Sequence, residues 1–228
     1  MTLPIIVKFF RKLPKARPMD DPEMWASKMR TAIQEFARKV NQRYEEGTLL
    51  RLLQLNHSES KRAAILALGM NGSYAVNGLL SKTLHDKDQV TAALAAESLW
   101  EIWFRAGTKE QNELLKKILT LPDPQKKIEA LSQLAMEATG FAEVINQRAI
   151  LYYQIGEYHK SIADCVRVLE INPYHFGAQA GMGECYLKLH KPKLALQSFR
   201  LALQINPTMT ELHSIIRDIQ RLVDESID

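Results

Sequence analysis

Apolar residues recur every three or four positions along most of the chain, which is the spacing of one face of an α-helix. The clearest run starts at Asp21, a suitable N-cap, with Pro22 at the first helical position. Up to Gly47 its apolar positions are Trp25, Met29, Ile33, Phe36, Val40 and Tyr44, which predict one long amphipathic helix. No stretch alternates apolar and polar residues for long enough to predict a strand. The fold class is therefore predicted to be all-α.

A period of 31 residues relates two segments of the first half. Its apolar positions Leu49, Leu53, Ala64 and Leu68 correspond to Leu80, Leu84, Ala95 and Leu99. In each segment an apolar helix ends in a short polar turn, and an Ala-rich helix follows. This plan resembles the short kind of HEAT-like repeat, with the departure that Thr91 stands where such repeats often place arginine.

A second period, of 34 residues, relates two segments of the second half. Small residues stand at Ala149 and Gly183 on one helix of each segment, and at Ser161 and Ala195 on the other. The same offset links Tyr152 with Tyr186, Cys165 with Phe199, Val168 with Ala202 and Pro173 with Pro207, and Gly156 suits the turn between the first two helices. Small residues let paired helices approach closely, while the larger ones fill the layer between them. This pattern resembles the tetratricopeptide repeat.

The two resemblances imply a right-handed α-solenoid of helix pairs, HEAT-like and then tetratricopeptide, which is an alpha-alpha superhelix. The expected parts are a basic flexible arm at 1–20, a long helix with HEAT-like repeats at 21–107, and a tetratricopeptide domain at 108–228. Within that domain we expect a degenerate repeat at 108–141, full repeats at 142–175 and 176–209, and a capping helix at 210–226. The order of motifs from about 97 to 207 also resembles a group of bacterial tetratricopeptide proteins.

The net charge of +4 is concentrated in the first 18 residues, which hold five basic residues and no acidic one. The remaining 210 residues sum to −1, so a basic stripe for nucleic acid is not expected on the fold. The segment is either a flexible arm or one docked on the first helix. An alternative is weak contact with an anionic membrane surface through residues 1–18, in which Ile5, Ile6, Phe9 and Phe10 insert.

Motifs of enzyme chemistry are missing from the sequence. The six histidines are scattered, Cys165 and Cys185 belong to no metal-binding pattern, and no phosphate-binding or nucleophile-elbow motif occurs. Both cysteines are expected to be buried, and two cysteines cannot form a disulfide framework. We therefore predict no catalytic residue, no metal, no cofactor, and a reducing, cytoplasmic location.

The tetratricopeptide resemblance implies that the first helix of each repeat lines an inner groove that holds a protein segment. The residues at its groove positions are Glu143, Asn146, Ile150, Tyr153 and Gln154, then Gly177, Ala180, Glu184, Leu187 and Lys188. The basic clamp of chaperone-binding members is absent, because only Asn146 fits it. The function expected is a non-catalytic adaptor for a protein partner. Alternatives are a nucleic-acid-binding repeat protein, a HEAT-like lyase or chaperone-type enzyme, and, for each groove residue, an ordinary solvated helix face.

Overall fold

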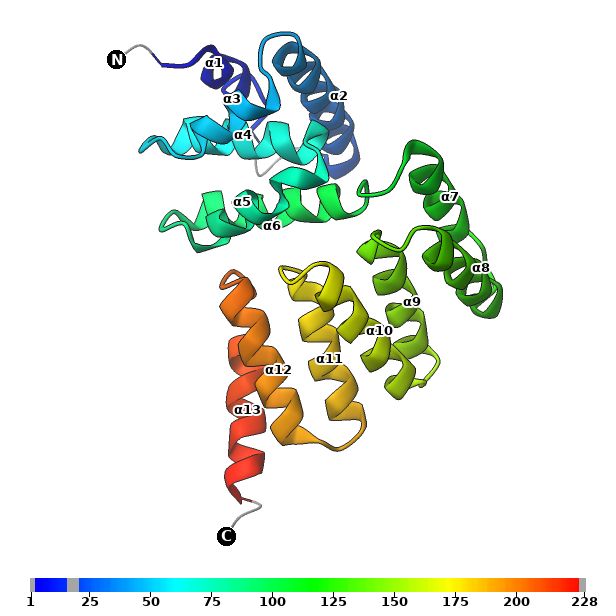
Figure 1. The fold of residues 1–228 in the computed structure, drawn as a ribbon. Coiled ribbons are helices and arrows are strands. Elements are labelled where there is room, and N and C mark those ends of the chain that lie inside the picture. The colour runs from blue at the N-terminus through cyan, green and yellow to red at the C-terminus, as the bar shows by residue number, and fades with distance from the viewer. Residues whose placement is uncertain (1–2, 16–20, 226–228) are drawn as a thin grey trace. The chain divides into compact units, whose positions relative to one another are not determined.

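The computed structural model describes residues 3–15 and 21–225, and in these ranges it contains helices and no strand (Figure 1). The all-α prediction is confirmed. The chain divides into two compact units, Met1–Ile102 and Trp103–Asp228. This boundary lies five residues before the one expected from the repeats. Within the described ranges, no helix is both long and apolar enough to cross a membrane.

The first unit contains short and medium helices that follow one another in antiparallel pairs. Their bounds are α1 (Ile5–Phe10), α2 (Pro22–Asn41), α3 (Glu46–Leu52), α4 (Ser58–Asn71), η1 (Tyr74–Val76), α5 (Asn77–Ser81), η2 (Lys82–His85) and α6 (Gln89–Trp103). The helix expected from Asp21 begins there, because the Asp21 carboxylate accepts the Met24 N–H at 2.8 Å. It ends at Asn41, before Tyr44, whose hydroxyl instead accepts the Ile6 N–H at 3.1 Å.

The residues related by 31 positions are all buried in the first unit. They are Leu49, Leu53, Ala64, Leu68, Leu80, Leu84, Ala95 and Leu99. A close approach between α4 and α6 supports the pairing, because a Cβ on Gly69 would lie 2.5 Å from Ser98 Oγ. The name HEAT-like for these helices stays a prediction.

The expectation of a flexible arm is wrong for the described part of the N-terminal segment. Ile5–Phe10 forms α1, and Ile6 and Val7 are buried at 0% and 1% exposure. Phe10 meets Phe36 edge-on, with ring centroids 6.4 Å apart, and Arg11 pairs with Glu59 at 2.5 Å. The burial of two aliphatic side chains stabilises the docked helix. Residues 1–2 and 16–20 of the expected arm lie outside the described residues.

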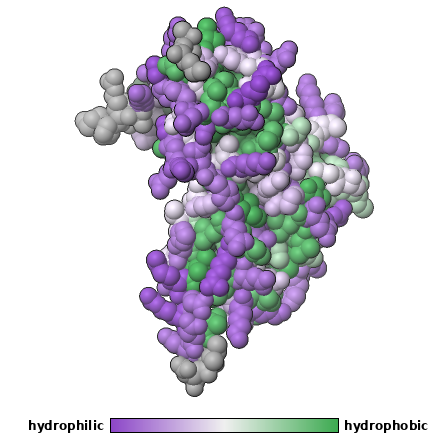
Figure 2. All heavy atoms as spheres, turned by 60° about the vertical axis from the view of Figure 1, so that its left-hand side comes forward, coloured by the Kyte–Doolittle hydropathy of each residue, from purple (hydrophilic) through white to green (hydrophobic). Residues whose placement is uncertain are grey.

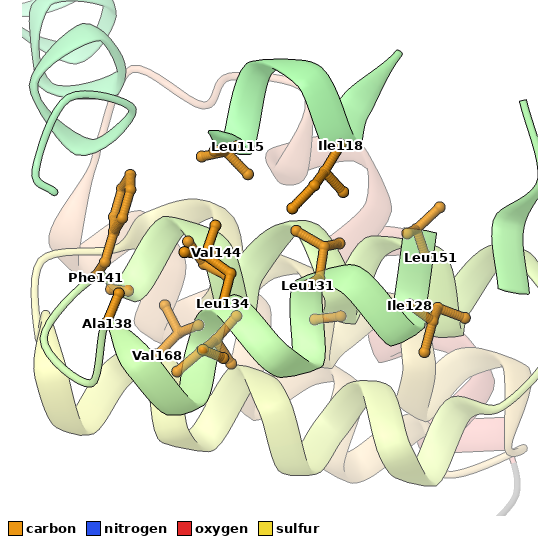
Figure 3. Close-up of a cluster of buried hydrophobic side chains, with 14 of the residues drawn as sticks. Leu115, Ile118, Ile128, Leu131, Leu134, Ala138, Phe141, Val144, Leu151 and Val168 are labelled. Atoms are coloured by element: carbon orange, nitrogen blue, oxygen red, sulfur yellow. The ribbon is translucent and has the colours of Figure 1, made fainter. Parts of the chain in front are cut away.

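The second unit is a row of antiparallel helices, green to red in Figure 1. Their bounds are α7 (Lys109–Leu119), α8 (Pro124–Glu137), α9 (Ala142–Gln154), α10 (Tyr158–Ile171), α11 (Phe176–Lys188), α12 (Pro192–Ile205) and α13 (Leu212–Glu225). In Figure 3, Leu115 and Ile118 point from α7 toward Leu131 on α8 and Val144 on α9. All four are at most 4% exposed, so the first three helices share one apolar core.

The small residues of the 34-residue period lie where helices touch. The Ser161 hydroxyl donates to the Ala149 carbonyl at 2.8 Å, and a Cβ on Gly183 would lie 2.6 Å from the Phe199 ring. Cys165, Val168, Ala195, Phe199 and Ala202 are buried, whereas Tyr152 and Tyr186 are partly buried at the edges of the two cores. α10 and α12 end at the C-caps Asn172 and Asn206, before Pro173 and Pro207.

The last helix, α13, covers the end of the row. Leu212, Ile219 and Val223 are buried and pack in one cluster with Ala195, Phe199 and Ala202 of α12. Its opposite face is exposed, with Arg217, Asp218 and Arg221 among its residues. A helix with one apolar and one charged face suits the end of a repeat stack.

Candidate protein-binding face

The accessible groove positions of the two repeats lie on α9 and α11. Ile150 is 41% exposed, and Gln154 and Lys188 are also exposed. Tyr153, Glu184 and Leu187 are half-buried, as are Gly177 and Ala180. We call Ile150, Tyr153, Gln154, Glu184, Leu187 and Lys188 the A-helix face. It mixes apolar, aromatic and charged side chains, and Figure 2 shows such a mixture of green and purple on the part of the molecule that carries the C-terminal end.

Tyr153 connects the two repeats on this face. Partial burial raises the pKa of its phenol, and the nearby charges of Glu184 and Tyr158 raise it further. Tyr158, at the start of α10, holds the ring from the side, with centroids 5.6 Å apart at 60°. Tyr153 therefore combines an apolar ring with a hydroxyl beside a carboxylate from the next repeat. Such a side chain contributes contact area at low conformational cost.

Two of the predicted groove residues, Glu143 and Asn146, are not accessible. Glu143 is 0% and Asn146 3% exposed. The Glu143 carboxylate accepts from Asn146 Nδ2 at 3.0 Å and from Gln147 Nε2 at 2.6 Å, and it pairs with His175 Nε2 at 3.0 Å. Burial of a carboxylate requires such donors. The expectation that these two residues line an open groove is therefore wrong.

The bonds of His175 determine its tautomer. Its Nδ1 accepts the Ala178 N–H at 3.0 Å as the N-cap of α11, so the ring proton is on Nε2 and is donated to Glu143. Trp103 stacks on the imidazole with centroids 4.3 Å apart at 21°, and it also touches Phe176 at 5.1 Å. The end of α6 thus covers the start of α11 and closes this part of the groove.

A polar junction between α8, α9 and α10 was not expected from the sequence. Arg148 donates to both oxygens of Asp164, at 2.7 and 2.6 Å, and to the Ser132 hydroxyl at 2.9 Å. The hydrogen bonds from Arg148 and its partly buried position make this a geometrically specific pair. Its only sequence signal is the spacing of 16 residues between an arginine and an aspartate on paired helices.

Both cysteines are buried between α10 and α11, as expected. Burial raises the pKa of the Cys165 thiol to about 12, and burial also raises the pKa of the Cys185 thiol. The Cys185 thiol donates to the Ser161 hydroxyl at 3.3 Å. Because the thiolate is the reactive form, these positions favour packing over nucleophilic chemistry. The described residues contain no group of three or more His, Cys, Asp or Glu side chains placed to hold a metal ion.

The first unit has a depression of about 720 Å³ near the turns that precede α4 and α6. Its base includes Leu50 and Leu53, and its rim includes Lys61 and Asp86, which pair at 2.6 Å. The neighbouring Asp88 accepts from Arg62 at 2.6 Å and from the Thr91 hydroxyl. Thr91 thus caps a turn at the position where arginine is common in HEAT-like repeats. These ion pairs explain the rim as contacts between successive turns.

Comparison with known proteins identifies the repeat. Residues 142–175 match the model of the tetratricopeptide repeat. A TPR repeat-containing protein of Rhizobium etli is 28% identical over 132 residues, which are 57% of this chain and 65% of the relative. The match thus spans less than two thirds of that relative.

Solved structures show a general likeness of fold. The first TPR of Spaghetti (RPAP3) bound to the HSP90 peptide SRMEEVD has a TM-score of 0.44 and 16% identity, covering 51% of this chain and 89% of that one. MamA has a TM-score of 0.43 and 17% identity, covering 66% and 86%. TTC0263 of Thermus thermophilus has a TM-score of 0.41 and 15% identity, covering 87% and 92%.

The 34-residue offset, the contact of Gly183 with Phe199 and the family match agree with one another. The chain is a tetratricopeptide repeat protein.

Proposed function

We propose that the chain is a non-catalytic adaptor that binds an extended or helical protein segment on the A-helix face. The observation that supports this most directly is the accessible Ile150 on α9 together with Tyr153 beside Glu184 of α11. A binding hot spot typically combines an aromatic side chain with apolar contacts, within a polar rim. Gln154, Glu184 and Lys188 supply that rim.

The burial of Asn146 narrows the chemistry of the partner. The basic clamp for an acidic C-terminal tail needs lysine or arginine with asparagine on this face, and Asn146 already donates to Glu143. The A-helix face holds one acidic and one basic residue, Glu184 and Lys188. We therefore propose a partner segment with apolar anchors and low net charge.

The alternatives receive less support. Residues 103–228 contain 15 Lys or Arg against 15 Asp or Glu, so the second unit has no excess positive charge for nucleic acid. An enzyme needs a group that can act as acid, base or nucleophile, and the two thiols have raised pKa values. The HEAT-like lyase alternative thus has no residue in the described part that favours it.

A display library of random peptides tests the adaptor proposal. Peptides selected on the wild-type chain should lose at least about tenfold in affinity for Tyr153→Ala and for Ile150→Ala, the usual effect of truncating an anchor. Met136→Ala is the matched control, because Met136 is 71% exposed on α8 and lies outside the A-helix face. Selection of no peptide, or equal losses in all three variants, would count against binding on this face.

A further inference from the structure

We infer that α1 and the second half of α2 form a docking surface for anionic lipid headgroups. The surface consists of Leu3, Ile5, Lys8, Lys12, Arg38 and Arg43, which we call the α1 face. It lies in the first unit and is independent of the adaptor proposal for the second.

The helical positions of α1 separate its buried and outer sides. Ile6, Val7 and Phe10 contact the core, with Phe10 meeting Phe36 of α2. At about 100° per residue, the opposite side carries Ile5, Lys8, Phe9 and Lys12. Of these, Phe9 is half-buried and lies under the Arg43 guanidinium at 5.4 Å from the ring centroid. The outer side of α1 thus presents Ile5 and two lysines beside Arg43.

Contacts with α2 place further basic side chains beside α1. Glu35 pairs with Lys39, which lowers the pKa of the Glu35 carboxyl, and the charges of Arg38 and Lys12 lower it further. Lys12 of α1 and Arg38 of α2 therefore lie near the same carboxylate. The other nearby acid, Glu59, is held by Arg11 at 2.5 Å. Lys8, Lys12 and Arg38 form no ion pair with another described residue.

The apolar members of the surface distinguish a lipid bilayer from other polyanions. Leu3 and Ile5 are 42% and 44% exposed next to these cations. A membrane interface offers both a place for such aliphatic side chains and negative charge for lysine and arginine. Nucleic acid would use the cations alone. The insertion expected from the sequence is altered, because Ile6 and Phe10 pack inward and only Leu3 and Ile5 remain to enter the interface.

Vesicle sedimentation of the full chain tests the inference. Vesicles of phosphatidylcholine with about one third phosphatidylserine should bind the chain at low salt, and pure phosphatidylcholine should not. Binding should weaken strongly as the salt rises toward about 1 M, where charge interactions reach only about 3 Å. Absence of binding to the anionic vesicles at low salt would overturn the inference.

Charge reversal at two lysines gives the sharpest comparison. Lys8→Glu with Lys12→Glu should lower the partition constant at least about 20-fold, since each basic side chain at an anionic surface contributes a factor of about five. The control, Lys109→Glu with Lys126→Glu, makes the same change of net charge at exposed positions near the starts of α7 and α8. It should bind nearly as wild type. An equal loss in the control would show that net charge alone causes binding, and would overturn the α1 face.

Ile5→Ser separates lipid from nucleic acid. The substitution should weaken vesicle binding by a factor of about five, because part of an exposed aliphatic side chain no longer enters the interface. Binding of a duplex oligonucleotide in the same buffer is the second arm. Tighter binding to the oligonucleotide than to the vesicles, unchanged in Ile5→Ser, would replace the lipid inference with a nucleic-acid one. Thermal melts of each variant verify that the exposed substitutions leave the fold intact.

Discussion

The repeats at 142–175 and 176–209 pack the same pair of helices with different side chains. The first has Ala149 with Cys165 at the helix contact, and the second has Gly183 with Phe199. A Cβ on Gly183 would lie within 2.6–2.8 Å of three Phe199 ring atoms, so the larger ring is accommodated by the loss of a methyl group on the facing helix. The comparison shows that a repeat position specifies a shared volume more strictly than a residue type.

A second difference concerns polarity between the helices. The first repeat joins α9 to α10 through Arg148 and Asp164, whose side chains are 14% and 10% exposed. The residues 34 positions later are Met182 and Ser198, of which Ser198 is buried and Met182 packs against the apolar core. An ion pair and an apolar contact thus occupy equivalent sites. Removing one partner should be costly, while exchanging both should be tolerated.

The largest effect is expected for Arg148→Met. It leaves the Asp164 carboxylate partly buried without its bidentate donor, and should lower the free energy of unfolding by about 2 to 3 kcal/mol. Arg148→Met with Asp164→Ser installs the pair of the second repeat, and should return to within about 1 kcal/mol of wild type. Urea unfolding followed by circular dichroism measures both. A single variant as stable as wild type would show that the ion pair contributes nothing to stability.

Glycine substitutions in α11 should differ in sign. Gly183→Ala places a methyl group against Phe199 and should destabilise the chain by about 1 to 3 kcal/mol. Gly181→Ala is the matched control: its Cβ would lie 3.7 Å from Cys165 Sγ, an ordinary contact. It should stabilise by up to about 1 kcal/mol, because alanine favours helix. Equal effects at the two positions would contradict the close contact.

A double-mutant cycle sharpens this result. Phe199→Cys reproduces the side chain of the first repeat, and in that background Gly183→Ala should lose its penalty. The coupling free energy between the two substitutions should be about 1 kcal/mol or more. A coupling near zero would mean that the methyl group is accommodated by backbone movement and not by the volume of Phe199.

The helix contacts could be predicted from the sequence because they recur. Ala149, Ser161, Gly183 and Ala195 follow one offset, and each recurrence marks a place where two helices touch. The burial of Glu143 could not be predicted in this way. It depends on His175, the last residue of its repeat, and on Trp103, which precedes both repeats. A contact that occurs once, between segments far apart, leaves no periodic signal.

The docking of α1 was unpredictable for a related reason. Residues 5–10 carry apolar side chains on both sides of the helix, so their own pattern does not select the buried side. The selection is made by Phe36 and Tyr44, which contact Phe10 and the Ile6 N–H. The composition of the segment, basic and without acids, indicated a free arm. Partner residues elsewhere in the chain decided otherwise.

The cysteine of the first repeat should make stability depend on alkaline pH. The pKa of Cys165 is raised from 9.0 to about 12 in the folded chain, so its stability contribution is complete below pH 9 and is lost between pH 9 and about 12. Near pH 10 the loss should be about 1.4 kcal/mol. Cys165→Ala should show a smaller decline between about pH 8 and pH 10 than wild type, whatever its stability at pH 8. Parallel declines would exclude titration of this thiol.

The smallest effect is expected at the turn between the helices of each repeat. Gly156 has φ +83°, and its counterpart His190 has φ 55°, the one non-glycine residue with a positive φ among those described. Both turns use the same bonds: Glu157 N–H donates to the Tyr152 carbonyl, and Lys191 N–H to the Tyr186 carbonyl, each at 2.8 Å. The backbone geometry is therefore shared, and only the first repeat uses the residue that adopts it without strain.

Exchange of these two residues should give changes of opposite sign. A side chain in the left-handed region costs about 1 to 2 kcal/mol, and glycine increases the entropy of the unfolded chain by about 0.4 to 1 kcal/mol. His190→Gly should therefore stabilise by about 0.5 to 1 kcal/mol, and Gly156→His should destabilise by a similar amount. Urea unfolding at one protein concentration resolves both shifts, with His159→Gly as a control for loss of an exposed histidine inside α10, where glycine should destabilise. If His190→Gly also destabilised, the imidazole would contribute a contact larger than the backbone strain, and the two turns would not be equivalent in energy despite their equal hydrogen bonds.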